Sequence, residues 1–154
     1  MANGVFEPRD PNYEQKVRDS FNRQTAMHTL GGRIVSIEPG HVVLEMAFNQ
    51  DFMQQHGFIH AGTITTMMDS AAGYAAFTLM SPEAAVLTIE FKTSLLAPAI
   101  GEQFRFEGRV TKPGRTITFC EADAIAVDAD GAEKKVAIMT ATMMSVTGRD
   151  DISS

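Results

Sequence analysis

Residues 63–80 form an apolar stretch that is rich in Ala, Met and Leu and that ends just before Ser81 and Pro82. These residue types and the absence of proline favour a helix. Apolar side chains fall on nearly every face of that helix, so it has no wide polar face to turn toward water. We therefore expect other parts of the chain to cover this helix on most sides.

The segments around this stretch predict one short helix and several strands. Residues 11–28 carry a weak helical stripe that stops at Gly31 and Gly32. Alternating apolar and polar residues, separated by turn sequences, predict a hairpin and then a long antiparallel meander at residues 33–38, 41–48, 87–95, 104–110, 116–127 and 134–146. We expect an α+β domain over residues 11–147, in which an antiparallel sheet wraps one long central helix and a short helix lies at the N-terminal end. Residues 1–10 and 148–154 are expected to be loosely held.

The composition excludes several functions. The chain has 154 residues, with 13 Lys+Arg against 19 Asp+Glu and a net charge of −6. Nucleic-acid modules need a clustered excess of basic residues, so nucleic acid is not an expected partner. The single cysteine, Cys120, excludes an intrachain disulfide and fits a reducing compartment. Residues 1–10 contain no apolar block that could act as a signal peptide or anchor, so we expect a cytoplasmic protein without a membrane partner.

Polar residues gather where the apolar helix begins. Residues 54–62 bring glutamine, histidine and glycine side chains to the helix start, where the backbone amides around Gly62 and Thr63 lack acceptors within the helix. The helix dipole favours negative charge there, so this turn can act as an oxyanion hole. Gly62 has no Cβ and would let a carbonyl approach closely. A simple helix cap is the alternative interpretation.

Asp69 is the exception within the apolar helix. A carboxylate there is costly unless it is paired, hydrated or functional, and a surface gap or a core hydrogen bond is the alternative to catalysis. Asp69 follows Gly62 by seven residues, so both lie on one helix face but about 10 Å apart. That separation is too long for one reacting carbonyl. If the two groups act together, a second copy of the helix must supply one of them, which predicts a site shared within a dimer.

Other candidate residues carry weaker signals. His56 and His60 have a spacing that could suggest a metal, but the residues between them read as loop, so we expect no metal. His60 is expected to hydrogen-bond the backbone and shape the loop. Cys120 is expected to pack in a strand rather than act as a nucleophile. Lys112 and Arg115 flank a turn where they could meet a phosphate-bearing ligand, or they could belong to a solvated strand face.

The spacing of Gln54, Gly57, His60-Ala61-Gly62 and Asp69 resembles that of the hotdog-fold acyl-CoA thioesterases, especially the PaaI type of the phenylacetate pathway. The resemblance extends more loosely over residues 21–146. It implies the hotdog fold, hydrolysis of a CoA thioester without a cofactor, and a homodimer that often pairs into a dimer of dimers. Two positions depart from the family pattern: Ala61 replaces the first motif glycine, and Gly73 replaces a hydroxyl residue that related branches use.

The resemblance also implies roles for individual residues. Asp69 resembles the catalytic carboxylate, which activates water or attacks the thioester, and the Gly62 amide resembles the oxyanion donor. Gln54 matches a side-chain amide near the thioester, His60 the motif histidine, and Thr88 a hydroxyl that positions water in some members. The residues expected to contact substrate are Gly57, Ala61, Thr63, Lys112 and Arg115.

Two other functions remain open. A hotdog enoyl-CoA hydratase or dehydratase would also hold an acyl thioester, although the chain lacks the His-x-x-x-Pro-Gly loop expected of acyl-carrier dehydratases. A non-catalytic acyl-CoA sensor is the second alternative, because a fold does not fix a function. Release of free thiol, a change in enoyl absorbance, or binding alone would distinguish the three.

Overall fold

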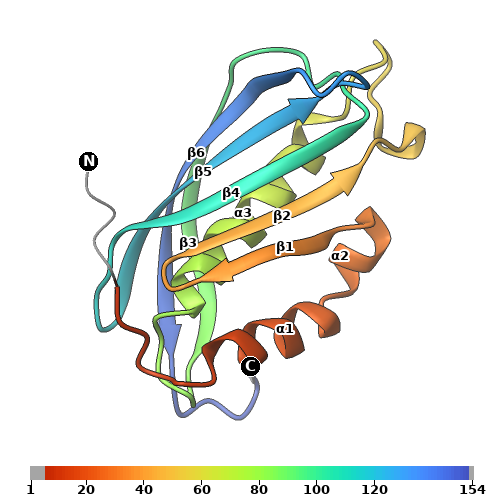
Figure 1. Cartoon of the computed structure of the whole chain (residues 1–154). Coiled ribbons are helices and arrows are strands. Elements are labelled where there is room, and N and C mark those ends of the chain that lie inside the picture. Colours follow the sequence, from red (N-terminus) through yellow and green to blue (C-terminus); the bar gives the residue numbers. More distant parts are fainter. Residues whose placement is uncertain (1–5, 153–154) are drawn as a thin grey trace.

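The computed structural model describes residues 6–152 and contains one six-stranded antiparallel sheet that curves around a long helix (Figure 1). The elements in chain order are α1 (Tyr13–Arg23), α2 (Thr25–Leu30), β1 (Arg33–Glu38), β2 (His41–Ala47), the 3₁₀ turn η1 (Gln50–Phe52), α3 (Ala61–Phe77), β3 (Ala85–Leu95), β4 (Gln103–Lys112), β5 (Ile117–Val127) and β6 (Glu133–Val146). The predicted α+β hotdog architecture is confirmed. The central helix α3 begins two residues earlier and ends three residues earlier than the apolar stretch predicted.

The strand order β1-β2-β4-β5-β6-β3 corrects one part of the prediction. A simple meander would place β3 beside β4, but β4 instead joins the N-terminal hairpin by pairing with β2. Strand β3 crosses to the far side of the sheet, pairs with β6, and becomes an edge. Residues 96–102 connect β3 to β4 and carry the chain across the sheet.

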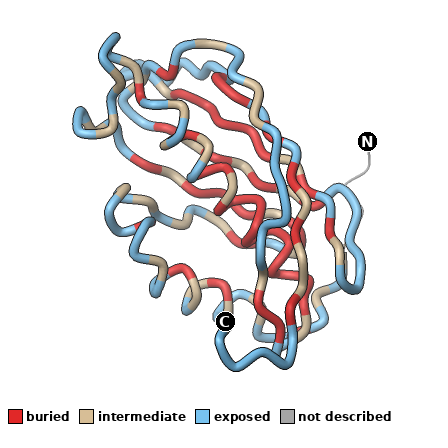
Figure 2. Tube along the Cα trace, turned by 180° about the vertical axis from the view of Figure 1, so that it is seen from behind, coloured by how far each residue is buried: buried red, intermediate tan, exposed pale blue. Residues whose placement is uncertain are grey.

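Helix α3 is buried along most of its length, as its apolar faces required. All residues from Ser70 to Phe77 are buried, and Figure 2 shows the buried helix lying against buried strands. Gly108 on β4 lets the sheet approach the helix backbone, because a Cβ at this position would lie 2.2 Å from the Ala71 carbonyl oxygen. This close approach fixes the height of α3 above the sheet.

Two short helices, rather than the single one expected, lie at the N-terminal end. The chain leaves the helical conformation at Gln24 (φ −80°, ψ 97°), and the second helix ends at Gly31, which has φ 69°. Val17 and Phe21 on α1 are buried, and the Phe21 ring lies 5.8 Å from that of Tyr74 on α3. The helix α1 therefore covers the C-terminal half of α3 and leaves its N-terminal half open.

The ends of the chain are described only in part. Of the expected loose segments, residues 1–5 and 153–154 lie outside the described residues. Phe6 packs against the core, and Asp10 forms a buried ion pair with Lys16 at 3.6 Å. Within residues 6–152, no helix combines the length and the apolar composition needed to cross a membrane.

Candidate active site

The N-terminal half of α3 exposes a narrow polar strip. Gly62, Thr65, Thr66 and Asp69 are exposed or half-buried, whereas the intervening Ile64, Met67 and Met68 are buried. A spacing of three or four residues places the strip on one face of the helix. This face lies toward the edge strand β3, because the Thr65 hydroxyl donates to the Thr93 hydroxyl at 3.4 Å. The predicted helix carboxylate thus opens onto an edge of the sheet.

Asp69 is held by one hydrogen bond from β3. The Thr88 hydroxyl donates to Asp69 Oδ1 at 2.8 Å, and a β-bulge between Thr88 and Glu90 interrupts the strand register just after Thr88. Burial raises the pKa of the Asp69 carboxyl above its usual value, and the hydrogen bond from Thr88 partly offsets that rise. Among residues 6–152, no cationic side chain forms an ion pair with Asp69. A desolvated carboxylate without a cation has an increased tendency to accept a proton.

The helix start is capped by the side chain of His60. The Gly62 amide donates to His60 Nδ1 at 2.8 Å, and the Thr63 amide donates to the His60 carbonyl at 3.0 Å. The expected backbone hydrogen bond of His60 is therefore present. The Gly62 amide, which the resemblance suggested as the oxyanion donor, already has an acceptor within the protein. Within the part of the chain that the structure describes, the Ala61 amide has no such acceptor.

The loop before the helix orients the amide of Gln54. The backbone amide of His56 donates to Gln54 Oε1. Because a backbone N–H can only donate, this bond fixes which end of the side-chain amide is oxygen. Among residues 6–152, no acceptor is bonded to Nε2, so it can donate to a ligand. Gly57 has φ +86°, a conformation that favours glycine, and its amide donates to the Gln54 carbonyl at 3.1 Å. The tight turn at Gly57 therefore presents the Gln54 side chain beside the helix start.

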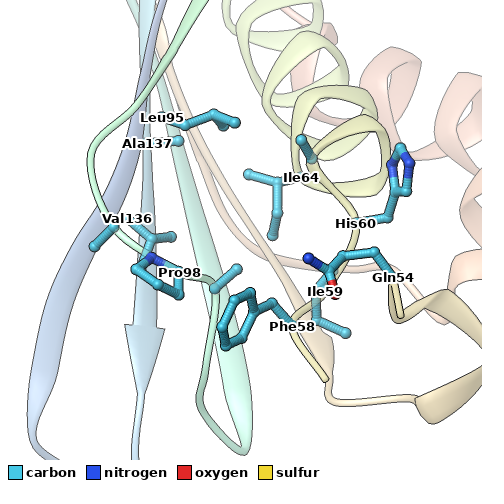
Figure 3. Close-up of a pocket in the computed structure, with 12 residues that line it drawn as sticks. Gln54, Phe58, Ile59, His60, Ile64, Leu95, Pro98, Val136 and Ala137 are labelled. Carbon is cyan, nitrogen blue, oxygen red and sulfur yellow. The ribbon is translucent and has the colours of Figure 1, made fainter. Parts of the chain in front are cut away.

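A cavity of about 320 Å³ lies next to this turn. Gln54, His60 and Ala61 line it on the loop side, and Ile64 lines it from the first turn of α3. Figure 3 shows Gln54 and Ile64 directed toward the cavity, with Leu95, Val136 and Ala137 on the opposite side. The lining is apolar apart from the Gln54 and His60 side chains.

The structure divides the predicted site residues into three groups within one chain. Gln54, Gly57, His60, Ala61, Gly62 and Thr63 gather at the helix start. Asp69 and Thr88 form a second group, about two helical turns further along α3. Lys112 and Arg115 lie in the exposed β4–β5 hairpin, at the sheet end where β3 begins and opposite the helix start.

The sequence analysis missed the residues that form the far wall of the cavity. Leu95 and Pro98 belong to the end of β3 and the connection after it, and Val136 and Ala137 belong to β6. Their apolar types match any strand, so only the crossover that brings β3 beside β6 reveals their shared position. No group of three or more His, Cys, Asp or Glu side chains that could hold a metal occurs among residues 6–152.

Comparison with known proteins places the chain in one family. Residues 56–132, half of the chain, match the family model of the thioesterase superfamily. A Saccharolobus solfataricus protein assigned as an esterase is 31% identical over 99 residues, which cover 64% of this chain and 69% of that protein. Human acyl-coenzyme A thioesterase 13 is 28% identical over 93 residues, which cover 58% of this chain and 64% of that protein.

Solved structures show the same relationship. A thioesterase family protein from Silicibacter pomeroyi is 56% identical and superposes with a TM-score of 0.87, covering 88% of this chain and 99% of that chain. The PaaI protein of the E. coli phenylacetic acid degradation operon superposes with a TM-score of 0.77 at 19% identity over 89% of this chain and 95% of that chain, a likeness of fold alone. The expected thioester hydrolase class is confirmed, and the chain belongs to the thioesterase superfamily with the hotdog fold.

Proposed function

We propose that the protein hydrolyses an acyl-CoA thioester to a free acid and CoA, in a site that two copies of the chain share. The observation that carries this proposal is Asp69, a partly desolvated carboxylate that lies on the open strip of α3 and has a single hydrogen-bond donor among residues 6–152. The relationship to acyl-coenzyme A thioesterase 13 supports the choice of CoA thioesters. The compartment, expected to be the cytoplasm, stays a prediction.

The thioester carbonyl binds at the helix start in this proposal. Its oxygen accepts hydrogen bonds from the Ala61 amide and from Gln54 Nε2, both of which border the cavity. We choose the Ala61 amide over the Gly62 amide because His60 Nδ1 already accepts the Gly62 N–H. Preorganised donors of this kind stabilise the charge that develops on the carbonyl oxygen as it is attacked.

A second copy is needed because Asp69 lies eight residues beyond Ala61, which is about 12 Å along the helix axis. The edge strand β3 offers the surface for that copy. It is the last strand in the sheet order and carries exposed Ile89 (50% exposed), Phe91 (46%) and Leu95 (59%), and a long, partly apolar edge strand of this kind favours pairing with another strand.

The geometry of β3 favours one pairing. In each chain, position 65 of α3 lies beside Thr93, and Asp69 lies beside Thr88. A two-fold axis near Phe91 would pair two β3 strands antiparallel and place Glu90 opposite Lys92 of the second copy, so that opposite charges meet twice. The same axis would bring Asp69 of one copy toward the helix start of the other.

In the proposed two-copy site, hydrolysis proceeds by general-base catalysis. Asp69 accepts a proton from a water molecule while the water oxygen attacks the thioester carbon, and Thr88 orients the carboxylate. The negative charge on the carbonyl oxygen is held by the Ala61 and Gln54 donors until the carbon–sulfur bond breaks. The CoA thiolate leaves and takes up the proton held by Asp69, which restores the carboxylate, and the acid product remains. Direct attack by Asp69 on the thioester is the variant of this step that the arrangement also permits.

The phosphates of CoA require cations, and Lys112 and Arg115 are available. Both side chains are exposed, and neither forms an ion pair with any of residues 6–152. In one chain their hairpin lies far from the helix start, but the two-fold axis proposed above would turn the hairpin of one copy toward the helix start of the other.

Replacement of the carboxylate tests the proposal. Asp69→Asn should abolish thiol release from acyl-CoA substrates, whereas Asp19→Asn on α1, which alters an exposed carboxylate, should leave it unchanged.

The same Asp69→Asn variant should also change the stability of the protein, because asparagine has no charge whose burial costs free energy. Because burial raises the Asp69 pKa, the folded state binds this proton more tightly than the unfolded state, and stability is lost as pH rises through that range. The Asp69→Asn variant should therefore melt at a higher temperature at neutral pH.

The outcomes separate the alternatives. An Asp69→Asn variant that keeps most of its thiol release would contradict the assignment of the carboxylate. If the unaltered protein changes enoyl absorbance without releasing thiol, it is a hydratase or dehydratase, and if it only binds acyl-CoA, it is a sensor.

A further inference from the structure

We infer that Met143 on β6 is a positioning residue of the proposed site, because its sulfur shares the Thr88 hydroxyl with Asp69 and weakens the hold of that hydroxyl on the carboxylate. The inference rests on the proposed function, since it assigns a role beside the same carboxylate. The contacts that support it lie within one chain and do not depend on how two copies pair. They concern the strand register, the two acceptors around one hydroxyl, and the burial of the sulfur.

The strand register brings Met143 and Thr88 together. Thr88 on β3 lies directly opposite Met143 on β6, and this is the last pair before the β-bulge between Thr88 and Glu90. The bulge adds one residue to β3, so Thr88 and Thr93 both reach α3 although they are five residues apart. In a regular strand, an odd separation turns two side chains to opposite faces. The bulge therefore sets the face on which Thr88 meets both Asp69 and Met143.

The Thr88 hydroxyl has two acceptors within reach. Thr88 Oγ1 lies 2.8 Å from Asp69 Oδ1 and 3.4 Å from Met143 Sδ, and both distances fit donation by the hydroxyl. A threonine hydroxyl carries one proton, so it donates to one of them at a time, and a thioether sulfur is the weaker acceptor. The hydroxyl therefore bonds mainly to the ionised Asp69. Once Asp69 is protonated, its oxygen attracts the hydroxyl less, and the sulfur offers the alternative partner.

Burial gives the weak sulfur bond its effect. Met143 is fully buried and belongs to the core that packs under α3. Among residues 6–152, Thr88 is the only hydrogen-bond donor to its sulfur. Because no water reaches the sulfur within the chain, the Thr88 hydroxyl does not compete with solvent for this acceptor. The sulfur therefore stabilises the state in which Asp69 is protonated, and its removal should lower the Asp69 pKa.

Charged groups of the same chain leave this balance to Thr88 and Met143. The Asp69 pKa is raised by burial and lowered by the bond from Thr88, without a contribution from an ionic partner among residues 6–152. On β3, the next charged residues, Glu90 and Lys92, lie on the other face of the sheet. On α1, the Lys16 ammonium binds carbonyls beyond the far end of α3. Groups that the second copy brings near Asp69 are the same in every variant below, so they cancel in the comparison.

Met143→Leu tests this role, because it keeps the volume of the buried side chain and removes the sulfur. The pKa of the Asp69 carboxyl, followed by NMR of isotope-labelled aspartate and assigned with the Asp69→Asn variant, should fall by about half a pH unit. The acidic limb of the kcat/KM profile should move to lower pH by the same amount. Met139→Leu is the matched control, because Met139 is likewise buried on β6 but lies opposite Thr93. It should leave the pKa and the limb in place.

A second comparison asks whether the sulfur acts through the hydroxyl. In a Thr88→Val background the hydroxyl is absent, so Met143→Leu should leave the Asp69 pKa where Thr88→Val alone puts it. Met143→Ile also lacks sulfur and has a side chain suited to a strand, so it should repeat the fall if the leucine variant folds poorly. An equal fall with and without the Thr88 hydroxyl would overturn the inference, because Met143 would then act by packing alone. An unchanged or raised pKa in the sulfur-free variants, or a matching fall in Met139→Leu, would overturn it as well.

The NMR titration needs no turnover, so it separates this inference from the proposed function. If the Asp69 pKa falls as expected but the unaltered protein releases no thiol, the proposed function fails and the effect of Met143 on the carboxyl stands. If thiol is released but the pKa and the acidic limb stay in place in Met143→Leu, the role of Met143 fails and the proposed function stands.

Discussion

The amide of Gln54 provides the sharpest test of how the carbonyl is held. Its Oε1 accepts the His56 N–H, so its Nε2 is the end that is free to donate to a substrate carbonyl. Gln54→Glu keeps an oxygen for His56 but replaces the donor with a second oxygen. The loop anchor survives while the hydrogen bond to the developing oxyanion is lost.

The expected magnitude follows from the loss of one donor. Removal of a single oxyanion donor in acyl-transfer sites lowers kcat by about 10²–10³. We therefore expect Gln54→Glu to lower kcat by at least about a hundredfold, with a smaller change in KM, in a thiol-release assay under saturating substrate. The melting temperature should stay close to that of the unaltered protein, because the contact with His56 persists.

The neighbouring Gln55 provides the matched control. Gln55→Glu adds the same charge one residue away, but Gln55 is exposed and does not line the cavity. It should therefore keep most of its kcat. If both variants keep similar rates, or if both lose activity equally, the reasoning that Gln54 Nε2 polarises the thioester is refuted.

Two further predictions concern the proton acceptor and the CoA moiety. Thr88→Val removes the hydrogen bond that lowers the Asp69 pKa, so the pKa should rise further and the acidic limb of the kcat/KM profile should move to higher pH. Thr93→Val, on the same strand, is the control and should leave that limb in place. A shift of the limb in both variants would contradict the assignment. Replacing Lys112 and Arg115 together by alanine should raise KM about tenfold for CoA thioesters and leave KM unchanged for N-acetylcysteamine thioesters, which lack the CoA phosphates. Equal effects on both substrate types would show that these two side chains do not bind the CoA phosphates.

Most of the fold could be predicted from local sequence patterns. The uniformly apolar stretch at residues 63–80 predicted a helix that other parts of the chain cover. The runs of alternating apolar and polar residues predicted the strands, because one face of each strand packs on that helix. The place of β3 could not be predicted, because alternation specifies a strand but not its neighbour. Likewise, the break at Gln24 depends on tertiary contacts: its side chain donates to the Tyr74 hydroxyl and accepts from Ser70.

The candidate site was predicted in outline but not in detail. The spacing from Gln54 to Asp69 located the helix start and the carboxylate. Which amide lacks an acceptor among residues 6–152 depends on the position of the His60 ring, which accepts the Gly62 N–H and not the Ala61 N–H. No spacing rule contains that information. The cavity depends on Val136 meeting the end of β3, a contact between segments about 40 residues apart in the chain.

The shared site can be tested by mixing two inactive variants. An Asp69→Asn copy still carries Gln54 and the helix start, whereas a Gln54→Glu copy still carries Asp69, so a heterodimer contains one site with both groups intact. Random pairing of equal amounts should restore about a quarter of the activity of the unaltered protein, because half of the dimers then hold one working site of two. If the mixture stays as inactive as its parents although heterodimers form, then the carboxylate and the helix start act within a single chain, and the account of a two-copy site is wrong.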